Sequence, residues 1–207
     1  MEKSFTTEQE AFWAGEFGDA YCQRNDDRTL VSPNIALFAQ ILRRTAGVRS
    51  AIEFGANVGL NLVALRALLP GVDLAAVEIN PSAAAKLSAI PELDVHAVSI
   101  LDFEPGRTYD LTLIKGVLIH IDPGSLDKVY DRLHRASNRY ICVAEYYNPT
   151  PVEVSYRGHA QRLFKRDFAG EMLDRFPDLA LVDYGFAYHR DANFPQDDTT
   201  WFLLEKR

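Results

Sequence analysis

A strand-like run that enters a glycine-rich turn is the first place where residue types and spacing suggest chemistry. Residues 51–54 are mostly apolar and lead into Gly55, Asn57 and Gly59, after which a helical pattern begins. In a doubly wound sheet, a nucleotide-like ligand binds outside the carboxyl ends of the strands. Gly55 permits a tight turn, and Gly59 permits close approach of the backbone to a ligand or a helix. The turn therefore predicts a site for a nucleoside-containing ligand.

The spacing within the turn distinguishes between such ligands. A dinucleotide fingerprint requires G-x-G-x-x-G, but Asn57 stands at the second glycine and Leu60 at the third, so binding of a pyrophosphate is disfavoured. Glu78, at the end of the next apolar run, is placed to accept hydrogen bonds from both hydroxyls of a ribose. Because NAD sites and S-adenosylmethionine sites both use such a carboxylate, Glu78 alone does not decide between them.

The pattern Glu53-x-Gly55-x-Asn57-x-Gly59 resembles motif I of class I methyltransferases, E/D-x-G-x-G-x-G, with asparagine in place of one glycine. The resemblance implies that the cofactor is S-adenosylmethionine, that backbone near Gly55 contacts its methionine part, and that Glu53 helps to position its amino group. It also implies that Asp102 faces the adenine and that residues 115–117 line the methionine end. The cofactor site expected on these grounds comprises Glu53, Gly55, Asn57, Gly59, Asn61, Glu78, Ile79, Asp102, Lys115, Gly116 and Val117.

Two histidines are candidates for acid–base chemistry beside this site. Methyl transfer is a direct displacement at carbon, so a protein mainly aligns donor and acceptor and excludes water. An acceptor hydroxyl also has to lose a proton to a base, and histidine, with an ordinary pKa near 6.5, suits that role. A structural, hydrogen-bonded role for His120 is an equally open interpretation. The predicted catalytic residues are His120, His159 and Tyr147.

The segments after residue 145 are rich in tyrosine and in cationic side chains. Arginine binds carboxylates and phosphates through a two-pronged fork, so basic groups on a net acidic chain favour an anionic small molecule. Ion pairs with surface aspartates are the alternative role for each cation. The predicted acceptor-binding residues are Tyr146, Tyr156, Arg157, Lys165 and Tyr188.

The elements that must position these residues alternate in type from residue 50 onward. Runs that are apolar on both faces, separated by amphipathic stretches, predict a parallel sheet covered on each side by helices. Two final strand-like runs are joined by a polar loop without a helix, which predicts an antiparallel hairpin. The strands are expected at 51–54, 74–79, 95–100, 111–118, 140–146, 179–188 and 200–204, and the helices at 60–69, 82–89 and 124–136.

Two further segments frame this α/β sheet. A helix is expected from Thr7 to Tyr21, with Glu10 placed for a capping box, and another after Pro33, which makes residues 1–48 a helical N-terminal cap. Residues 148–170 show no clear period but are rich in aromatic and charged side chains, which is typical of a functional insertion on the acceptor side. By analogy with class I methyltransferases, we expect one Rossmann-like domain over residues 1–207, with a seven-stranded, mostly parallel sheet and an antiparallel C-terminal hairpin.

Composition excludes several classes of function. The 207 residues carry a formal net charge of −7, and an acidic chain is a poor binder of nucleic acid. Cys22 and Cys142 lie far apart without a CxxC pair or a histidine cluster, so neither a disulfide nor a metal site is expected. No run approaches the roughly 18 apolar residues that span a bilayer, so we expect a cytoplasmic protein without membrane contact. The oligomeric state is left open.

Three stretches together resemble one family, the pseudaminic acid biosynthesis-associated methylases. They include FWAGEFGDAY at 12–21, AEYYNPTPV at 144–152 with YRGH at 156–159, and DYGF at 183–186 with FPQDD at 194–198. The resemblance implies a class I fold, S-adenosylmethionine and, less firmly, a carboxylated sugar as acceptor. By analogy with relatives of this fold, Trp13, Tyr21 and Arg24 on the N-terminal helix would cover the cofactor. Core packing at helical spacing is the alternative role for Trp13.

The leading hypothesis is therefore an S-adenosylmethionine-dependent methyltransferase that acts on a hydroxyl or amine of a small, anionic acceptor such as a nonulosonic (pseudaminic-type) sugar. One alternative is a nicotinamide-dependent reductase, which the incomplete glycine fingerprint disfavours. A second is a non-catalytic, cofactor-binding partner of a larger enzyme. Action on protein or tRNA is a further alternative, and the acidic chain disfavours tRNA.

Overall fold

A seven-stranded sheet forms the centre of the computed structural model, which describes residues 5–25 and 28–207. The strand order is β3-β2-β1-β4-β5-β9-β8. Neighbouring strands from β3 to β5 are parallel, whereas β9 is antiparallel to both β5 and β8. The strands are β1 (Ser50–Phe54), β2 (Asp73–Val77), β3 (Leu93–His96), β4 (Tyr109–Lys115), β5 (Ser137–Glu145), β8 (Leu179–Ala187) and β9 (Thr199–Lys206). The predicted fold class, including the antiparallel C-terminal hairpin, is confirmed.

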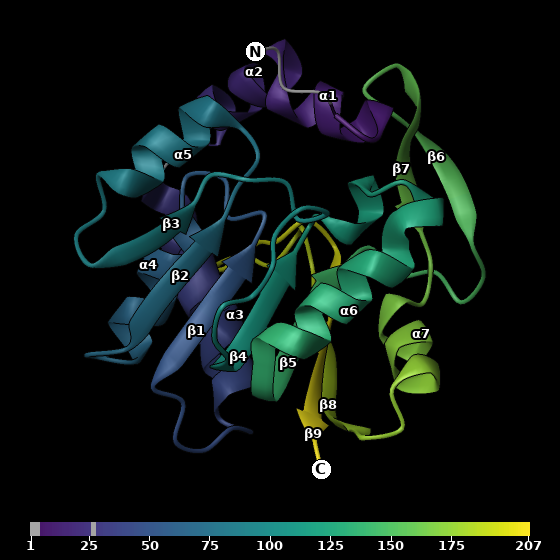
Figure 1. Ribbon diagram of the computed structural model, residues 1–207. Helices are drawn as coiled ribbons and strands as arrows, with labels where there is room; N and C mark the ends of the chain where they lie inside the picture. The colour runs from purple at the N-terminus through teal and green to yellow at the C-terminus, as the bar shows by residue number, and fades with distance from the viewer. Residues whose placement is uncertain (1–4, 26–27) are drawn as a thin grey trace.

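Helices cover both faces of this sheet (Figure 1). The apolar strand residues divide into two core clusters, one holding Ile52 and Phe54 and the other Ala51 and Leu74. Alternate residues of β1 thus face opposite cores, which explains why the strands are mostly apolar. The helices flanking the sheet are α3 (Val31–Leu42), α4 (Leu60–Leu68), α5 (Pro81–Ser88), α6 (Leu126–Ala136) and α7 (Phe168–Arg175), with short 3-10 turns η1 (Arg28–Leu30), η2 (Leu118–His120) and η3 (Pro123–Ser125).

The N-terminal segment forms two helices, α1 (Glu8–Ala14) and α2 (Glu16–Arg24), above the carboxyl ends of the strands (Figure 1). The predicted capping box is present, since the Thr7 side chain accepts from Glu10 N and the Glu10 side chain accepts from the Thr7 backbone. The single helix expected over 7–21 is wrong, because the chain leaves helical geometry at Gly15, where φ is −101° and ψ is −157°.

Residues 148–170 are more regular than predicted. They contain a two-stranded antiparallel hairpin of β6 (Val152–Tyr156) and β7 (His159–Lys165), followed by the start of α7. Arg157 and Gly158 form its turn with φ of 50° and 86°, the left-handed pair that suits a tight hairpin. The side chains of β6 are largely exposed. Because neither face of β6 is buried in a core, no alternation of apolar and polar residues marks it in the sequence.

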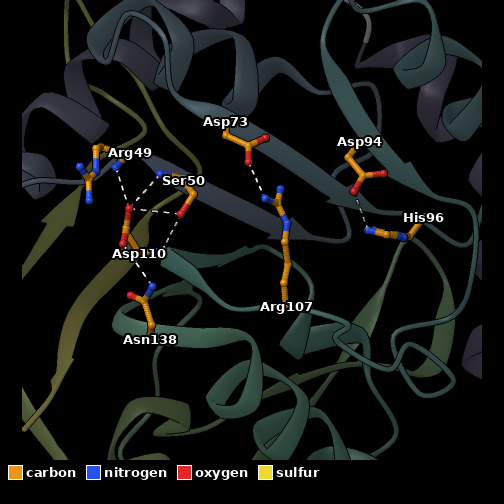
Figure 2. A network of polar contacts seen from close by, with 8 residues as sticks. All are labelled: Arg49, Ser50, Asp73, Asp94, His96, Arg107, Asp110 and Asn138. Carbon is orange, nitrogen blue, oxygen red and sulfur yellow. Dashed lines mark hydrogen bonds and ion pairs between the residues drawn. The ribbon is translucent and has the colours of Figure 1, made fainter.

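A polar network joins the amino ends of the central strands (Figure 2). The Asp110 carboxylate accepts hydrogen bonds from Arg49 N at 2.8 Å, Ser50 N at 3.0 Å and Asn138 Nδ2 at 3.2 Å. Burial raises the pKa of Asp110, but these donors outweigh it and leave the pKa below its ordinary value. The network fixes the register of β1 against β4 at the edge opposite the predicted site.

Candidate functional site

A cavity of about 250 Å³ lies at the carboxyl edge of the sheet, where β1 and β4 meet. The strand order reverses between these two strands, and such switch points are where ligands bind in open α/β sheets. Its walls come from α1 and α2, from the turn after β1, from the ends of β2 and β4, and from residues 99–101 and 195–197. The cavity therefore lies where the sequence placed the cofactor.

The turn after β1 has the backbone geometry that its glycines predict. Gly55 has a φ of 75°, and a Cβ there would lie 2.6 Å from Val117 Cγ2. Asn57 also adopts a left-handed conformation, with a φ of 49°. Gly59 has a φ of 82°, but a Cβ there would meet the Leu87 and Ile90 side chains at 2.8 Å. Gly59 therefore packs closely against α5 and the residues that follow it, and it does not line the cavity. Gly55 and Asn57 do line it.

Glu78 lies in the cavity wall and also holds the turn together. Its Oε2 accepts from Asn57 N at 2.7 Å and its Oε1 accepts from Asn80 N at 2.8 Å. Burial raises the pKa of the Glu78 carboxyl, and the backbone donors oppose that rise. Each carboxylate oxygen has two acceptor positions, so Glu78 keeps one on each oxygen for a ligand.

Three cavity-lining residues carry buried polar atoms that have no hydrogen-bond partner among the described residues. They are Trp13 Nε1, Asn57 Oδ1 and Asn61 Oδ1. A buried polar group without a partner costs on the order of 1–3 kcal/mol. Their convergence on one cavity indicates a polar ligand rather than a packing defect.

Behind this wall, Glu53 is almost fully buried and does not itself line the cavity. Its Oε1 accepts from Asn61 Nδ2 at 2.6 Å, whereas its Oε2 has no partner among the described residues. Burial raises the pKa of Glu53 to about 8, and Asn61 and Lys115 oppose the rise. Lys115 lines the cavity, and burial lowers the pKa of its ammonium group.

His120 lines the cavity beside two aromatic rings. Its ring centroid lies 4.7 Å from that of Trp13 and 4.8 Å from that of Tyr156. Nδ1 lies 2.5 Å from the Arg162 carbonyl oxygen. A carbonyl only accepts, so Nδ1 carries the proton and Nε2 keeps its lone pair. Burial lowers the pKa of His120 to about 4, so the ring is neutral near pH 7.

Glu145, at the end of β5, positions the segment that carries His120. Its Oε1 accepts from Val117 N and Leu118 N, both at 2.9 Å. Burial raises the pKa of Glu145 to about 7, against the pull of these donors. The Glu145 carboxyl therefore holds the backbone at the start of η2. Its described hydrogen bonds are to this backbone and give it no direct contact with an acceptor.

Besides Glu53 and Gly59, two further residues expected at the cofactor lie outside the cavity lining. Asp102 is exposed, because β3 ends at His96 rather than at residue 100 and the following turn directs residues 99–101 inward instead. Asp102 thus lies outside the cavity lining, and its position facing the adenine stays a prediction. Arg24 is also exposed, and its guanidinium lies 5.7 Å from the Phe17 ring centroid instead of lining the cavity. Trp13, Tyr21 and Ile79 do line it.

The predicted acceptor-side residues separate into two groups. His159, Tyr147 and Tyr188 are exposed and do not line the cavity, so the structure does not bring them to His120. His159 instead packs against the Phe12 ring at 5.1 Å. The exposure follows from their positions on β7, after β5 and after β8, beyond the carboxyl edge that is covered by α1 and α2.

The second group does not line the cavity either, and of its members only Tyr156 has a described contact with His120. Tyr156 contacts the His120 ring, Arg157 lies over Tyr156 at 5.8 Å, and Lys165 Nζ lies over the Tyr146 ring at 5.1 Å. Burial raises the pKa of Tyr146 to about 12, so its hydroxyl stays protonated and able to donate. These two cations form no ion pair with a carboxylate within the described chain.

Several residues that line the cavity were not predicted from the sequence. Asn80 does carry a sequence signal, because an asparagine before proline is a typical N-cap of a helix. Its Oδ1 accepts from Ala83 N at 2.9 Å. Gln196 and Asp197 lie in the FPQDD string, yet nothing in their spacing places them at β1. The lining residues missed include Gln9, Glu10, Asn34, Asn80, Ser99, Gln196 and Asp197.

No candidate metal site, meaning a group of three or more histidine, cysteine, aspartate or glutamate residues, occurs among the described residues. Within the same part of the chain, no helix has the length and apolar character needed to cross a membrane.

Together, the strand order, the antiparallel hairpin and the cavity at the β1–β4 switch define the class I methyltransferase fold. No family model and no curated protein matches the sequence. Several solved structures resemble the chain in fold. The chain is 19% identical to the 1,6-didemethyltoxoflavin-N1-methyltransferase of Burkholderia thailandensis, with a TM-score of 0.69 over 100% of this chain and 93% of that one.

Two further solved structures share the fold. Magnesium protoporphyrin IX methyltransferase from Synechocystis PCC 6803 is 11% identical, with a TM-score of 0.67 over 99% of this chain and 100% of that one. The plantazolicin methyltransferase BpumL is 14% identical, with a TM-score of 0.65 over 96% of this chain and 94% of that one. The first of these was solved with S-adenosylmethionine and the second with S-adenosylhomocysteine. At such identities the likeness establishes the fold.

Proposed function

We propose that this protein is an S-adenosylmethionine-dependent methyltransferase that acts on a small molecule. The observation that carries the proposal is the cavity at the β1–β4 switch, where Glu78 adjoins the Gly55 turn and unpartnered polar atoms of Trp13, Asn57 and Asn61 converge. The same fold holds S-adenosylmethionine or S-adenosylhomocysteine in three of the solved structures that resemble it.

The residues of the cavity fit an adenosyl ligand. The free acceptor positions of Glu78 suit the two ribose hydroxyls, and Ile79 with residues 99–101 would flank the base. Gly55, Gly116 and Val117 would lie along the methionine part, with Trp13 and Tyr21 above it. The bound cofactor supplies a methyl group already activated by a sulfonium. The chain itself therefore has to orient both partners and keep water out.

His120 would bind the proton of the acceptor. Arg162 O holds the ring in one tautomer, which leaves Nε2 with its lone pair next to the cavity. Because its pKa is about 4, His120 is a weak base but a permanent hydrogen-bond acceptor near pH 7. It would align an acceptor hydroxyl or amine and take up its proton as the new bond to carbon forms.

The acceptor that these surroundings suit is a small anion. Arg157 lies over Tyr156, whose ring contacts His120, and Lys165 lies over Tyr146; neither cation forms an ion pair within the described chain. Such unpaired cations favour a carboxylate or a similar group. A carboxylated, nonulosonic-type sugar, which the sequence resemblance implies, has this chemistry.

Calorimetric titration tests the cofactor directly. S-adenosylmethionine and S-adenosylhomocysteine should bind the wild-type protein, and NADH should not. Absence of binding by both sulfur ligands would refute the proposal. Transfer of a labelled methyl group to N-acetylneuraminate, as a carboxylated nine-carbon sugar, would then test the acceptor class, with its methyl ester as the uncharged comparison.

A further inference from the structure

Large apolar side chains are exposed along β8, the strand at one edge of the sheet. Among the described residues, the two most exposed of them are Tyr184 at 65% and Phe186 at 58%, both on β8. Tyr188, just after this strand, is 46% exposed, and Tyr147, after β5, is 41% exposed. Single exposed apolar residues are ordinary on a protein surface, whereas a contiguous group of them marks an interaction site.

These side chains lie together on one face of the sheet. Tyr184 is opposite Phe202 of β9, and their rings are stacked with centroids 6.3 Å apart. Phe202 also lies 5.9 Å from the Tyr147 ring, and the rings of Phe186 and Tyr188 lie 6.1 Å apart. Side chains two residues apart along a strand share a face, so Phe186 continues the row that Tyr184 begins. We call this surface the aromatic face; it comprises Tyr147, Tyr184, Phe186, Tyr188 and Phe202.

The described chain covers only the first part of this side of β8. Leu179, at the start of the strand, is buried in one core cluster with Met172 of α7. Beyond Leu179, the residues that point to this side become exposed. The opposite side of β8 is covered instead, since Val182 packs against the other core cluster and Asp183 pairs with Arg44 at 3.0 Å. The aromatic face is therefore the open side of a half-buried strand.

The outer edge of β8 is less suited to an added strand than the aromatic face is to a packed partner. Asp183 Oδ1 accepts a hydrogen bond from Tyr184 N at 3.0 Å, so one backbone donor of the edge strand already has a partner. A register shift between Leu181 and Asp183 also interrupts the pairing of β8 with β9 at this place. A partner is therefore expected to pack on the aromatic face rather than to extend the sheet.

The chemistry of the aromatic face suits a second copy of the same chain. A two-fold interface brings the same patch of both subunits together, so the patch has to be compatible with itself. No member of the aromatic face carries a charge, although the chain has a formal net charge of −7. Two copies can therefore meet here without the like-charge repulsion that acidic patches would cause. Aromatic rings also favour contact with one another.

The size of the aromatic face sets the strength of such a dimer. A fully buried aromatic side chain covers roughly 150–250 Å², so the exposed parts of these rings amount to roughly 400–500 Å² of each copy. Pairing two copies would bury about 800–1,000 Å², close to the roughly 1,000 Å² of a specific interface. An interface of this size predicts a dimer that dissociates in the micromolar range.

We propose that the aromatic face joins two copies of this chain in a two-fold dimer, with Tyr184 and Phe186 at its centre. The proposal gives a role to Tyr147 and Tyr188, which the structure leaves outside the cavity lining. It depends on neither the cofactor nor the acceptor, so it goes beyond the proposed function and can fail or stand separately from it.

Sedimentation equilibrium over chain concentrations of about 1–200 µM tests the dimer. The wild-type protein should change from monomer to dimer across this range. Phe186→Asp and Tyr184→Asp should each weaken association at least about tenfold, because each brings two identical carboxylates together near the two-fold axis. Val154→Asp makes a similar change at an exposed apolar residue of β6 and should leave association unchanged. A wild-type protein that stays monomeric throughout would overturn the proposal, as would a dimer that both aspartate variants at the aromatic face leave intact.

Oxidative footprinting of the wild-type protein needs no variant to fold. Relative to Val154, Tyr184 and Phe186 should be oxidised several-fold less at the highest chain concentration than at the lowest. Equal oxidation at both concentrations would overturn the assignment of the interface to the aromatic face. Binding of S-adenosylhomocysteine tests the proposed function separately, because neither result depends on the other.

Discussion

Replacing Glu78 by glutamine tests whether one carboxylate holds the turn and the ligand at once. In the native turn both oxygens accept from backbone N–H groups, of Asn57 at 2.7 Å and Asn80 at 2.8 Å. Glutamine offers one acceptor oxygen and one amide NH₂. The substitution therefore leaves one backbone N–H facing another donor, although the side chain keeps its shape.

The cost follows from these two contacts. A hydrogen bond to a charged group contributes about 1.5–3 kcal/mol, and a buried donor without a partner costs a further 1–3 kcal/mol. Removing a charge that burial already disfavours recovers part of this loss. We expect a net fall of about 2–4 kcal/mol in the free energy of unfolding. For a chain of this length, that corresponds to a fall of about 4–16 °C in the midpoint of thermal unfolding.

Thermal unfolding of Glu78→Gln should be measured with and without S-adenosylhomocysteine. Glu16→Gln, an exposed glutamate in the first turn of α2, makes the same chemical change without buried partners. If Glu78→Gln unfolds within about 1 °C of this control, the carboxylate does not hold the turn and the reasoning from its two contacts fails. A normal ligand-induced stabilisation would separately remove Glu78 from the ribose site.

Three further predictions concern separate parts of the fold. Burial lowers the pKa of His120 to about 4, so protonation below pH 6.5 favours the unfolded chain. Between pH 7 and pH 4, the free energy of unfolding measured by urea denaturation should fall by roughly 3 kcal/mol more in the wild-type protein than in His120→Asn. Parallel plots of this free energy against pH for the two proteins would contradict the prediction. Gly55→Ala forces a side chain into a φ of 75° and to 2.6 Å from Val117, so thermal unfolding should show a loss of at least about 1–2 kcal/mol together with weaker binding of S-adenosylhomocysteine. Asp110→Ala should lower the free energy of unfolding by about 1–3 kcal/mol at pH 7, with a deficit that shrinks as the pH falls through the lowered pKa of Asp110. Since Asp110 lies at the opposite edge of the sheet, altered ligand affinity would count against this role.

Much of the fold was predictable because burial imposes a pattern on the sequence. Strands β1, β4 and β5 are largely buried on both faces and are therefore mostly apolar. The hairpin of β6 and β7 was not recognised, because the backbone pairing that stabilises it leaves no such pattern. The end of β3 was misplaced for a related reason. Its residues are only partly buried, so the apolar residues of the next turn looked like its continuation.

The site residues that the local backbone positions could be predicted from the sequence. Those that reach the site through tertiary contacts could not. Gly55, Asn57 and Glu78 lie at strand ends, and the parallel sheet necessarily gathers such ends at one edge. Gln196 lines the cavity beside Asn34, and its Nε2 donates to Asn34 Oδ1 at 3.0 Å, a contact across 162 residues of sequence. Asp102 lies outside the cavity lining, because β3 ends at His96, earlier than the sequence predicts.

The cover over the cavity carries a kinetic consequence. Glu10 on α1 accepts a hydrogen bond from Ser99 Oγ, and Gln9 Nε2 donates to Gln161 O at 3.2 Å on β7. These contacts hold α1 against the turn after β3 and against β7, over the cavity. We therefore expect release of S-adenosylhomocysteine to follow the opening of the N-terminal helices, so that Gln9→Leu, which removes the donor to the Gln161 carbonyl, would alter turnover without altering the chemical step.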